Sequence, residues 1–149
     1  MAAEAAPPLG VYGTLLDAEV RRLVLGRCRT RAALLCGWQR VYVAGEVYPG
    51  IRMREGAKTN VLVLDGLDRH ALDRCDAFEG AEYTRQRLPV RFRTGGHMGE
   101  AMFYVPTAAV RLTGRPWRYD WAWRARHRRA FLTMTREAVR GRGAGRRQP

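Results

Sequence analysis

Apolar and polar positions change their spacing several times along the chain, and these changes predict a mixture of strands and helices. Residues 9–12 form a short apolar run that ends at Gly13, which is typical of a strand. Asp17 then precedes apolar residues spaced three and four positions apart, so we expect it to cap a helix that ends at Gly26. This part of the chain therefore predicts a strand, a glycine turn and a helix.

The middle of the chain is dominated by residues that favour strands. Residues 32–43 are apolar and aromatic with few breaks, which indicates a buried strand or a hairpin bent at Gly37. At residues 48–51, a proline followed by a glycine predicts a turn that interrupts regular structure. Branched residues at 59–64 then predict a short strand, and Gly66 closes it.

A second helix and a hairpin are expected next. Asp68 can cap a helix whose apolar residues recur at helical spacing as far as Gly80. The period then changes to two over residues 83–92, which predicts a strand with an irregularity or an edge at Pro89. A glycine-rich turn leads into another apolar run at residues 101–105, so the two strands should pair as a hairpin.

The last predicted element is a long helix that Asp120 caps. Its apolar positions lie among arginines and are Trp121, Phe131, Leu132 and Thr135. We expect this aromatic stripe to pack on the sheet and the arginines to face water. Beyond Arg140, glycine and arginine predominate, which predicts fraying. The pattern thus predicts one α+β domain at residues 9–140, between a disordered lead-in at 1–8 and a disordered tail at 141–149.

Composition agrees with a single domain of that size. With 149 residues and 46% hydrophobic content, the chain can bury one core. No apolar run approaches the roughly 18 residues of a membrane span, and the start lacks the basic and apolar segments of a secretory signal. Three cysteines without a C-x-x-C pair argue against a disulfide framework and a structural zinc site. We therefore expect a reduced, cytoplasmic protein without membrane contact.

The net charge of +13 suggests nucleic acid only until it is divided along the chain. Residues 1–110 carry 15 Lys and Arg against 12 Asp and Glu, whereas residues 111–149 carry 12 against 2. The basic character therefore belongs to the C-terminal segment and not to the rest of the domain. Nearly all of it is arginine, with Lys58 the only lysine. A nucleic-acid contact through the arginine-rich tail is the alternative that this segment leaves open.

Most common catalytic signatures do not occur in the sequence. Serine is absent, so no serine nucleophile exists. The histidines, His70, His97 and His127, are isolated from any carboxylate or cysteine at metal-ligand spacing. The glycine-rich segment 95–99 lies between two expected strands and lacks Gly-Lys-Ser/Thr, so a hairpin turn explains it better than a phosphate loop. Cys75 lies on the apolar face of a helix, where a buried thiol is expected.

Two positions carry candidate chemistry. Glu79 lies near the C-terminal end of the second helix, where the helix dipole disfavours a carboxylate. It either points to solvent, pairs with Arg74 or Arg85, or acts in catalysis. The turn at residues 12–15 can direct successive backbone N–H groups towards an anion, although an ordinary strand-to-helix turn has the same sequence. Spacing alone favours the ordinary turn and a structural role for Glu79.

Four short segments occur in an informative order. They are Val11-Tyr12-Gly13-Thr14-Leu15, Tyr48-Pro49-Gly50-Ile51, Asp76-Ala77-Phe78-Glu79-Gly80 with Tyr83 and Arg85, and Ala101-Met102-Phe103-Tyr104-Val105. Together they resemble the γ-glutamylcyclotransferase family in its AIG2-like branch, and the resemblance covers roughly residues 9–106. Cys75, where the family usually has leucine, and the arginine-rich extension depart from the family's pattern.

The resemblance implies a fold and a set of site residues. The implied fold is an α+β single domain, a small mixed β-barrel with flanking helices. Glu79 is implied as the acid and base, and backbone groups of the loop at 12–15 are implied to hold a γ-glutamyl group. The residues implied for substrate binding are Tyr12, Gly13, Thr14, Leu15, Tyr83 and Tyr104. For the tyrosines, packing in the core or in the hairpin is the alternative.

The implied reaction needs no protein nucleophile. In a γ-glutamyl amine or amino acid, the α-amino group can attack the γ-carbonyl, which gives 5-oxoproline and a free amine without a metal or organic cofactor. Enclosure by Phe78 would raise the pKa of Glu79 towards the range in which it can move this proton. The alternative is a ligand-binding or regulatory module of the same fold without turnover. The sequence leaves the identity of the amine and the oligomeric state open.

Overall fold

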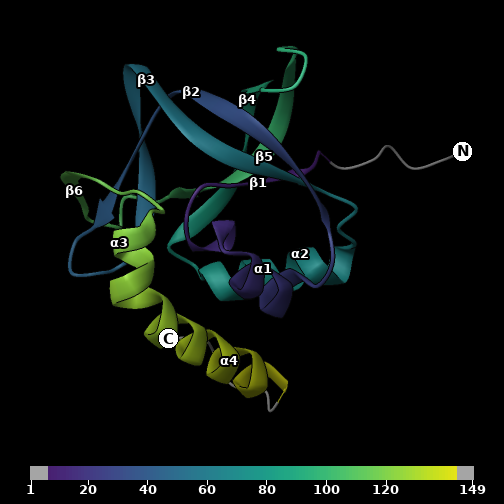
Figure 1. Ribbon diagram of the computed structural model, residues 1–149, viewed down its shortest axis with the longest axis vertical. Coiled ribbons are helices and arrows are strands. Elements are labelled where there is room, and N and C mark those ends of the chain that lie inside the picture. Colours follow the sequence, from purple (N-terminus) through teal and green to yellow (C-terminus); the bar gives the residue numbers. More distant parts are fainter. Residues whose placement is uncertain (1–6, 144–149) are drawn as a thin grey trace, which may run out of the picture.

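Five strands close into a barrel, because the outer strands of the sheet pair with each other. The computed structural model describes residues 7–143 (Figure 1). The barrel strands are β1 (Leu9–Val11), β2 (Arg29–Val43), β3 (Pro49–Asp65), β4 (Tyr83–Phe92) and β5 (Met98–Pro106). They follow the order β3-β1-β5-β4-β2, and β2 pairs back to β3. β1 and β5 are parallel, whereas the other pairs are antiparallel. The predicted mixed barrel with flanking helices is confirmed.

Side chains of the strands themselves fill the barrel. Ala33 and Leu35 of β2 and Val63 of β3 belong to one buried apolar cluster with Phe103 of β5. β1 passes so close to Phe103 that a Cβ at Gly10 would collide with its ring. The interior is therefore a packed core, and a site of useful size must lie outside it.

β2 and β3 are longer than the sequence predicts. In place of the turn predicted at residues 48–51, β3 begins at Pro49 and runs for 17 residues. The turn prediction is wrong, because proline is tolerated as the first residue of a strand. The strand predicted at 59–64 lies within β3, which ends before Gly66 as expected. Gly50 is needed there since a Cβ would lie 2.7 Å from two neighbouring side chains. β2 is one strand and not a hairpin, and the bend at Gly37 (φ +87°) accompanies a register shift against β3.

Two capped helices lie below one end of the barrel (Figure 1). α1 (Ala18–Leu25) and α2 (Arg69–Glu79) begin after Asp17 and Asp68, whose carboxylates accept hydrogen bonds from backbone N–H groups of the first turn. A glycine with positive φ ends each helix. Both predicted helices are confirmed, and Cys75 of α2 is buried as expected.

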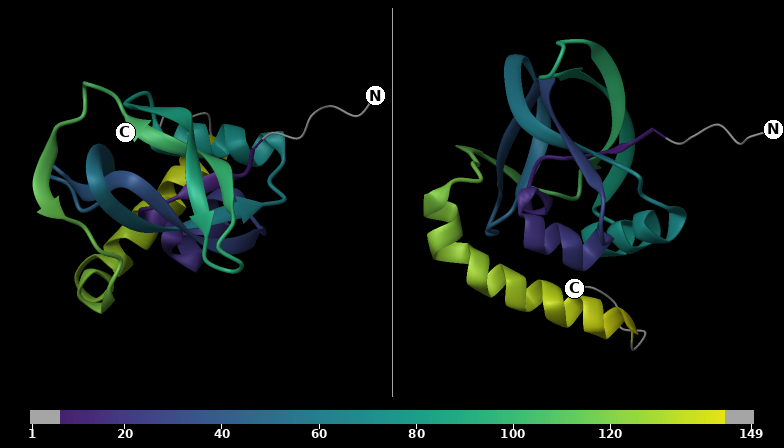
Figure 2. Two further views of the ribbon diagram at one scale, coloured as in Figure 1. Left: turned by 90° about the horizontal axis from the view of Figure 1, so that it is seen from above. Right: turned by 45° about the vertical axis from the view of Figure 1, so that its right-hand side comes forward.

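A long C-terminal helix runs below the two shorter ones (Figure 2). It consists of α3 (Trp121–Trp123), the π-helical turn η2 (Arg124–Arg128) and α4 (Arg129–Gly143). Asp120 caps it as predicted, by accepting a hydrogen bond from the Trp123 N–H. The expected packing on the sheet is wrong, since α4 contacts α1 and the Phe131 ring meets Phe78 of α2. A barrel that fills its own interior offers no such face, so the apolar stripe covers the helices instead.

The ends of the predicted domain can be compared only in part. α4 continues to Gly143, beyond the fraying expected after Arg140. Residues 1–6 of the expected lead-in and 144–149 of the expected tail lie outside the described residues.

Trp121 was expected in the buried stripe of the C-terminal helix, but its side chain is 75% exposed. No helix within residues 7–143 combines the length and the apolar composition needed to cross a bilayer.

The predicted hairpin is confirmed. β4 and β5 pair from Tyr83 to Arg91 without a register shift, Pro89 included. Pairing of β4 with β2 ends at Val90, so Pro89 lies at an edge on that side, where its missing N–H is not needed. A further strand, β6 (Leu112–Pro116), pairs with the end of β2. The sequence did not predict β6, because its five residues show no alternation between buried and exposed positions.

Candidate active site

A cavity of about 550 Å³ lies between β1, the end of α2 and α4. We call residues 12–15, which lead from β1 into the 3₁₀ turn η1 (Thr14–Leu16), the cradle loop. The cavity is lined by residues 10–15, Glu46, Tyr48, Pro49, residues 78–83, Tyr104, Phe131 and Met134. All of the residues predicted for the site therefore line one cavity, although five separate segments of the sequence supply its walls.

Glu79 contributes a carboxylate without a partner. Its side chain is half-buried and makes no hydrogen bond or ion pair with another described residue. Arg85 pairs instead with Asp76, at 3.0 Å between Nε and Oδ1, and Arg74 donates to the Val24 carbonyl. Burial, and secondarily the negative charge of Asp76, raises the pKa of Glu79 to about 7. Both the protonated and the ionised forms are therefore populated near neutral pH.

Tyr83 places an unsatisfied hydroxyl in the same cavity. Its oxygen is buried and has no hydrogen-bond partner among the described residues. Burial, followed by the negative charge of Glu79, raises the pKa of Tyr83, so the hydroxyl keeps its proton. A buried hydroxyl left unpaired costs roughly 1–3 kcal/mol. A bound molecule with an acceptor oxygen would relieve that cost.

Hydrogen bonds fix the other tyrosines in place. The buried Tyr12 hydroxyl donates to the Tyr104 carbonyl at 2.6 Å. The Tyr104 hydroxyl donates in turn to Oδ1 of Asp76 at 2.5 Å, and Asp76 also holds Arg85. Burial, followed by the charge of Glu79, raises the pKa of Tyr12. The chain of contacts ties β1, β5 and α2 together around Glu79.

The cradle loop offers free backbone donors. The N–H group of Leu16, which follows the loop, donates to the Gly13 carbonyl at 2.9 Å, whereas the N–H groups of Thr14 and Leu15 have no acceptor among the described residues. A Cβ at Gly13 would lie 2.9 Å from the ring of Pro49, so only glycine fits there. Two adjacent free N–H groups form a place for an oxyanion or a carbonyl oxygen.

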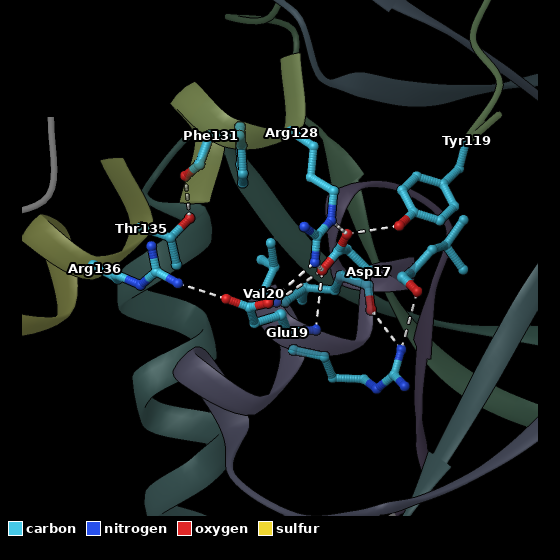
Figure 3. Close-up of polar contacts among 11 residues, drawn as sticks. Asp17, Glu19, Val20, Tyr119, Arg128, Phe131, Thr135 and Arg136 are labelled. Atoms are coloured by element: carbon cyan, nitrogen blue, oxygen red, sulfur yellow. Dashed lines mark hydrogen bonds and ion pairs between the residues drawn. The ribbon is translucent and has the colours of Figure 1, made fainter. Parts of the chain in front are cut away.

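A partly buried ion pair attaches the C-terminal helix next to the cradle loop. Asp17 accepts from Nε of Arg128 and from the Tyr119 hydroxyl, each at 2.6 Å (Figure 3). Burial by itself raises the pKa of Asp17, but hydrogen bonds from Arg128, Tyr119 and the Val20 N–H outweigh it, so the pKa is lowered. The carboxylate therefore stays ionised and holds Arg128 throughout the neutral pH range.

A second ion pair lies two turns further along the helix. Arg136 contacts Glu19 of α1 at 2.5 Å (Figure 3). Between the two ion pairs, Phe131 and Met134 face the cavity and form part of its wall. Helix α4 is thus a wall of the site as well as a cover for α1.

Several lining residues were not predicted. Glu46 and Glu82 are exposed carboxylates in connecting loops, and nothing in their sequence context distinguishes them from ordinary surface residues. Tyr48 and Pro49 belong to a segment that carried the resemblance but had no assigned role. Phe131 was expected in an apolar stripe, and the helical period alone could not show that this stripe meets the cavity.

Another hollow does not contain the candidate residues. It has a volume of about 1080 Å³ and is lined by Arg40, Arg54, Glu55 and Lys58 among others. Arg40 supports the cradle loop from this side, since its guanidinium donates to the Tyr12 carbonyl at 2.9 Å. No group of three or more His, Cys, Asp or Glu in the described part of the chain could hold a metal ion.

Comparison with known proteins identifies the family and the fold of this chain. The family model for γ-glutamyl cyclotransferase, AIG2-like, matches residues 9–125. The chain belongs to this family. AIG2-like protein D of Arabidopsis thaliana is 30% identical over 131 residues, or 85% of either chain.

Solved structures share the AIG2-like fold. The solution structure of a protein from Arabidopsis thaliana has a TM-score of 0.64 at 26% identity, and the match covers 93% of this chain and 86% of the other. A structure described as a γ-glutamyl cyclotransferase has a TM-score of 0.61 at 16% identity. The match covers 72% of this chain and 68% of the other. The latter likeness is one of fold.

The region that the AIG2-like family model matches contains only part of the cavity lining. Residues 9–125 include the cradle loop, Glu79 and Tyr83, whereas Phe131 and Met134 follow the end of the match. The family region therefore supplies the candidate reactive groups, and the C-terminal helix closes the cavity on one side.

Proposed function

We propose that this AIG2-like protein is a γ-glutamylcyclotransferase that converts a γ-glutamyl amine or amino acid into 5-oxoproline and the free amine. The observation that carries the proposal is the unpaired Glu79 carboxylate, with its pKa near 7, in a cavity that the cradle loop also lines. Such a pair of features fits a reaction that needs a held acyl group and a mobile proton, but no protein nucleophile.

The bond changes balance within the substrate and Glu79. A C–N bond forms between the α-nitrogen and the γ-carbonyl carbon, while the C–N bond to the amine breaks. The α-ammonium gives up two protons and the departing nitrogen gains two as it leaves as an ammonium ion. One group that accepts and returns a proton, acting twice, therefore completes the reaction.

Glu79 is suited to that exchange. A free α-ammonium group has a pKa of about 8, which is close to the pKa of about 7 that burial gives Glu79. Groups of similar pKa exchange a proton readily, and positioned acid-base catalysis of this kind contributes roughly 10²–10⁴-fold. An ordinary exposed glutamate would be too weak a base for the same step.

The remaining free donors fit the substrate's oxygens. No Lys or Arg lines the described cavity, so an α-carboxylate bound there depends on backbone donors. We assign that role to the N–H groups of Thr14 and Leu15, which have no acceptor among the described residues. The unpaired Tyr83 hydroxyl suits the γ-carbonyl oxygen, on which negative charge develops during ring closure.

The first test measures 5-oxoproline release. The purified protein is incubated with a panel of γ-glutamyl amines and amino acids, alone and as the Glu79→Gln variant. We expect product from at least one conjugate and a loss of kcat of about 10²–10⁴-fold in Glu79→Gln, because glutamine keeps the size but not the proton exchange. Glu55→Gln, an exposed residue beside the other hollow, is the matched control and should keep full activity.

Two results would change the assignment. Undiminished turnover in Glu79→Gln would contradict the role given to that carboxylate. Absence of product from every conjugate would favour a ligand-binding or regulatory module of the same fold.

A further inference from the structure

The charged side chains that line the cavity are all acidic. Glu46, Glu79 and Glu82 lie on its wall, and no Lys or Arg does among the described residues. This is unusual for a chain with a net charge of +13. The cavity therefore presents a local negative field on a basic molecule, and that field attracts cations.

The acidic groups occupy two different depths. Glu79 is half-buried beside the unpaired Tyr83 hydroxyl, and this is where the reacting atoms bind under the proposed function. Glu46 and Glu82 are exposed, so they lie towards solvent. Their charges still reach the lining tyrosines, because both contribute to the raised pKa values of Tyr48 and Tyr83 after burial. The outer carboxylates thus face the part of a substrate that projects away from Glu79.

An apolar surface accompanies these carboxylates. Phe131 and Met134 of α4 and Phe78 of α2 line the same cavity. Ion pairs of Arg128 and Arg136 with α1 hold the helix that carries this wall (Figure 3). A volume of about 550 Å³ exceeds the need of a γ-glutamyl group alone, since cavities of roughly 300–1,000 Å³ accommodate drug-sized ligands.

The loop that carries Glu46 is also held in place. The Val47 carbonyl accepts hydrogen bonds from the indole N–H groups of Trp117 and Trp123, at 2.8 and 2.7 Å. Both indole side chains are buried. A fixed loop gives the Glu46 carboxylate a defined place at the cavity edge.

We propose that the amine released by this protein is an alkylamine with a second, distal ammonium group, so that the preferred substrates are γ-glutamyl conjugates of diamines. The inference rests on the proposed function. Phe131 and Met134 contact the methylene chain, and Glu46 and Glu82 attract the distal ammonium. A carboxylate beside that ammonium weakens binding, because the cavity has no lysine or arginine to offset it.

Three conjugates with matched leaving groups test this inference. γ-Glutamylcadaverine carries a distal ammonium, γ-glutamylpentylamine has the same chain without it, and ε-(γ-glutamyl)lysine has the ammonium with an added carboxylate. We expect kcat/KM for the cadaverine conjugate to exceed each of the others by about fivefold at low salt, the effect of two exposed charge pairs. The advantage should shrink in 0.5 M NaCl, where the Debye length falls to roughly 4 Å.

A double variant assigns the effect to the two carboxylates. In Glu46→Gln with Glu82→Gln, the ratio of kcat/KM for the cadaverine conjugate to that for the pentylamine conjugate should fall to about one, because only the cadaverine conjugate loses a charge pair. Both residues are exposed, so the fold tolerates these changes. Glu55→Gln should keep the wild-type preference.

The outcomes separate this inference from the proposed function. If 5-oxoproline forms from all three conjugates at equal rates, or best from the lysine conjugate, the diamine preference is overturned and the cyclisation stands. A preference that persists in the double variant overturns the assignment to Glu46 and Glu82. If no conjugate yields 5-oxoproline, the proposed function fails and this inference fails with it.

Discussion

At the scale of single residues, the raised pKa of Glu79 favours proton exchange but lowers the stability of the folded protein. Folding moves its pKa from the ordinary 4.5 to about 7, because the cavity disfavours the ionised form. Between those pH values the folded protein binds more protons than the unfolded chain. The free energy of unfolding therefore falls as pH rises through this window.

Glu79→Gln should stabilise the protein in a pH-dependent manner. Above pH 7 the variant escapes the cost of a buried negative charge, which is about 3 kcal/mol for a shift of this size. Below pH 4.5 the wild-type residue is protonated in both states, so the two proteins should unfold alike. Urea unfolding at pH 8 and pH 4 measures the difference, and an equal gain at both pH values would contradict the raised pKa.

At residue level, the sequence drew attention to a glutamate at a helix C-terminus and to a glycine after a short strand, and the resemblance connected the two. The structure places both on the wall of one cavity. The exposed glutamates at 46 and 82 and Met134 gave no such signal. Their part in the cavity depends on contacts between distant segments, which local pattern does not encode.

At the scale of elements, helix ends were predicted best, because capping depends on residues only a few positions apart. Asp17, Asp68 and Asp120 all cap the helices that follow them. Strand limits were predicted less well. β3 passes through a Pro-Gly pair and β6 has no periodic signal, since each is held by pairing with the distant β2.

Asp17→Asn should weaken the attachment of the C-terminal helix. Asparagine can still accept the N–H groups of α1, but it loses the charge that pairs with Arg128. We expect a loss of about 2 kcal/mol in the free energy of unfolding, the usual worth of hydrogen bonds to a buried charged group. KM should rise more than kcat falls, because Phe131 and Met134 line the cavity rather than hold the reacting atoms.

The matched control is Arg136→Gln, which removes the neighbouring ion pair with Glu19. Both of its partners are more than 40% exposed, so its loss should cost no more than about 1 kcal/mol. Denaturant unfolding and steady-state kinetics compare the two variants. Equal losses would show that burial of Asp17 adds nothing to the attachment.

At the scale of the whole molecule, the charge is divided between a basic C-terminal segment and an acidic cavity. The family model matches residues 9–125, which include the strands of the barrel. The residues that line the cavity lie between Gly10 and Met134. Everything that the proposed reaction needs lies before residue 135. The barrel was predicted through the resemblance and not from periodicity, because closure depends on pairing between β2 and β3 along their length.

Ending the chain at Gly143 should leave catalysis intact. This truncation removes residues 144–149, which contribute two arginines and no residue of the described cavity. We expect kcat/KM for the best conjugate to stay within about twofold of the full chain, while any affinity for nucleic acid falls with the lost charges. A large loss of turnover would place a functional group in the removed segment.

The wall that α4 adds separates two parts of the cavity along the sequence. Phe131 and Met134 follow the region that the family model matches, whereas Glu79 and the cradle loop lie within it. Replacing the terminal helix would therefore change the apolar wall and leave the barrel strands and Glu79 as they are. The same boundary offers a graft point for directing the proposed cyclisation towards a chosen amine.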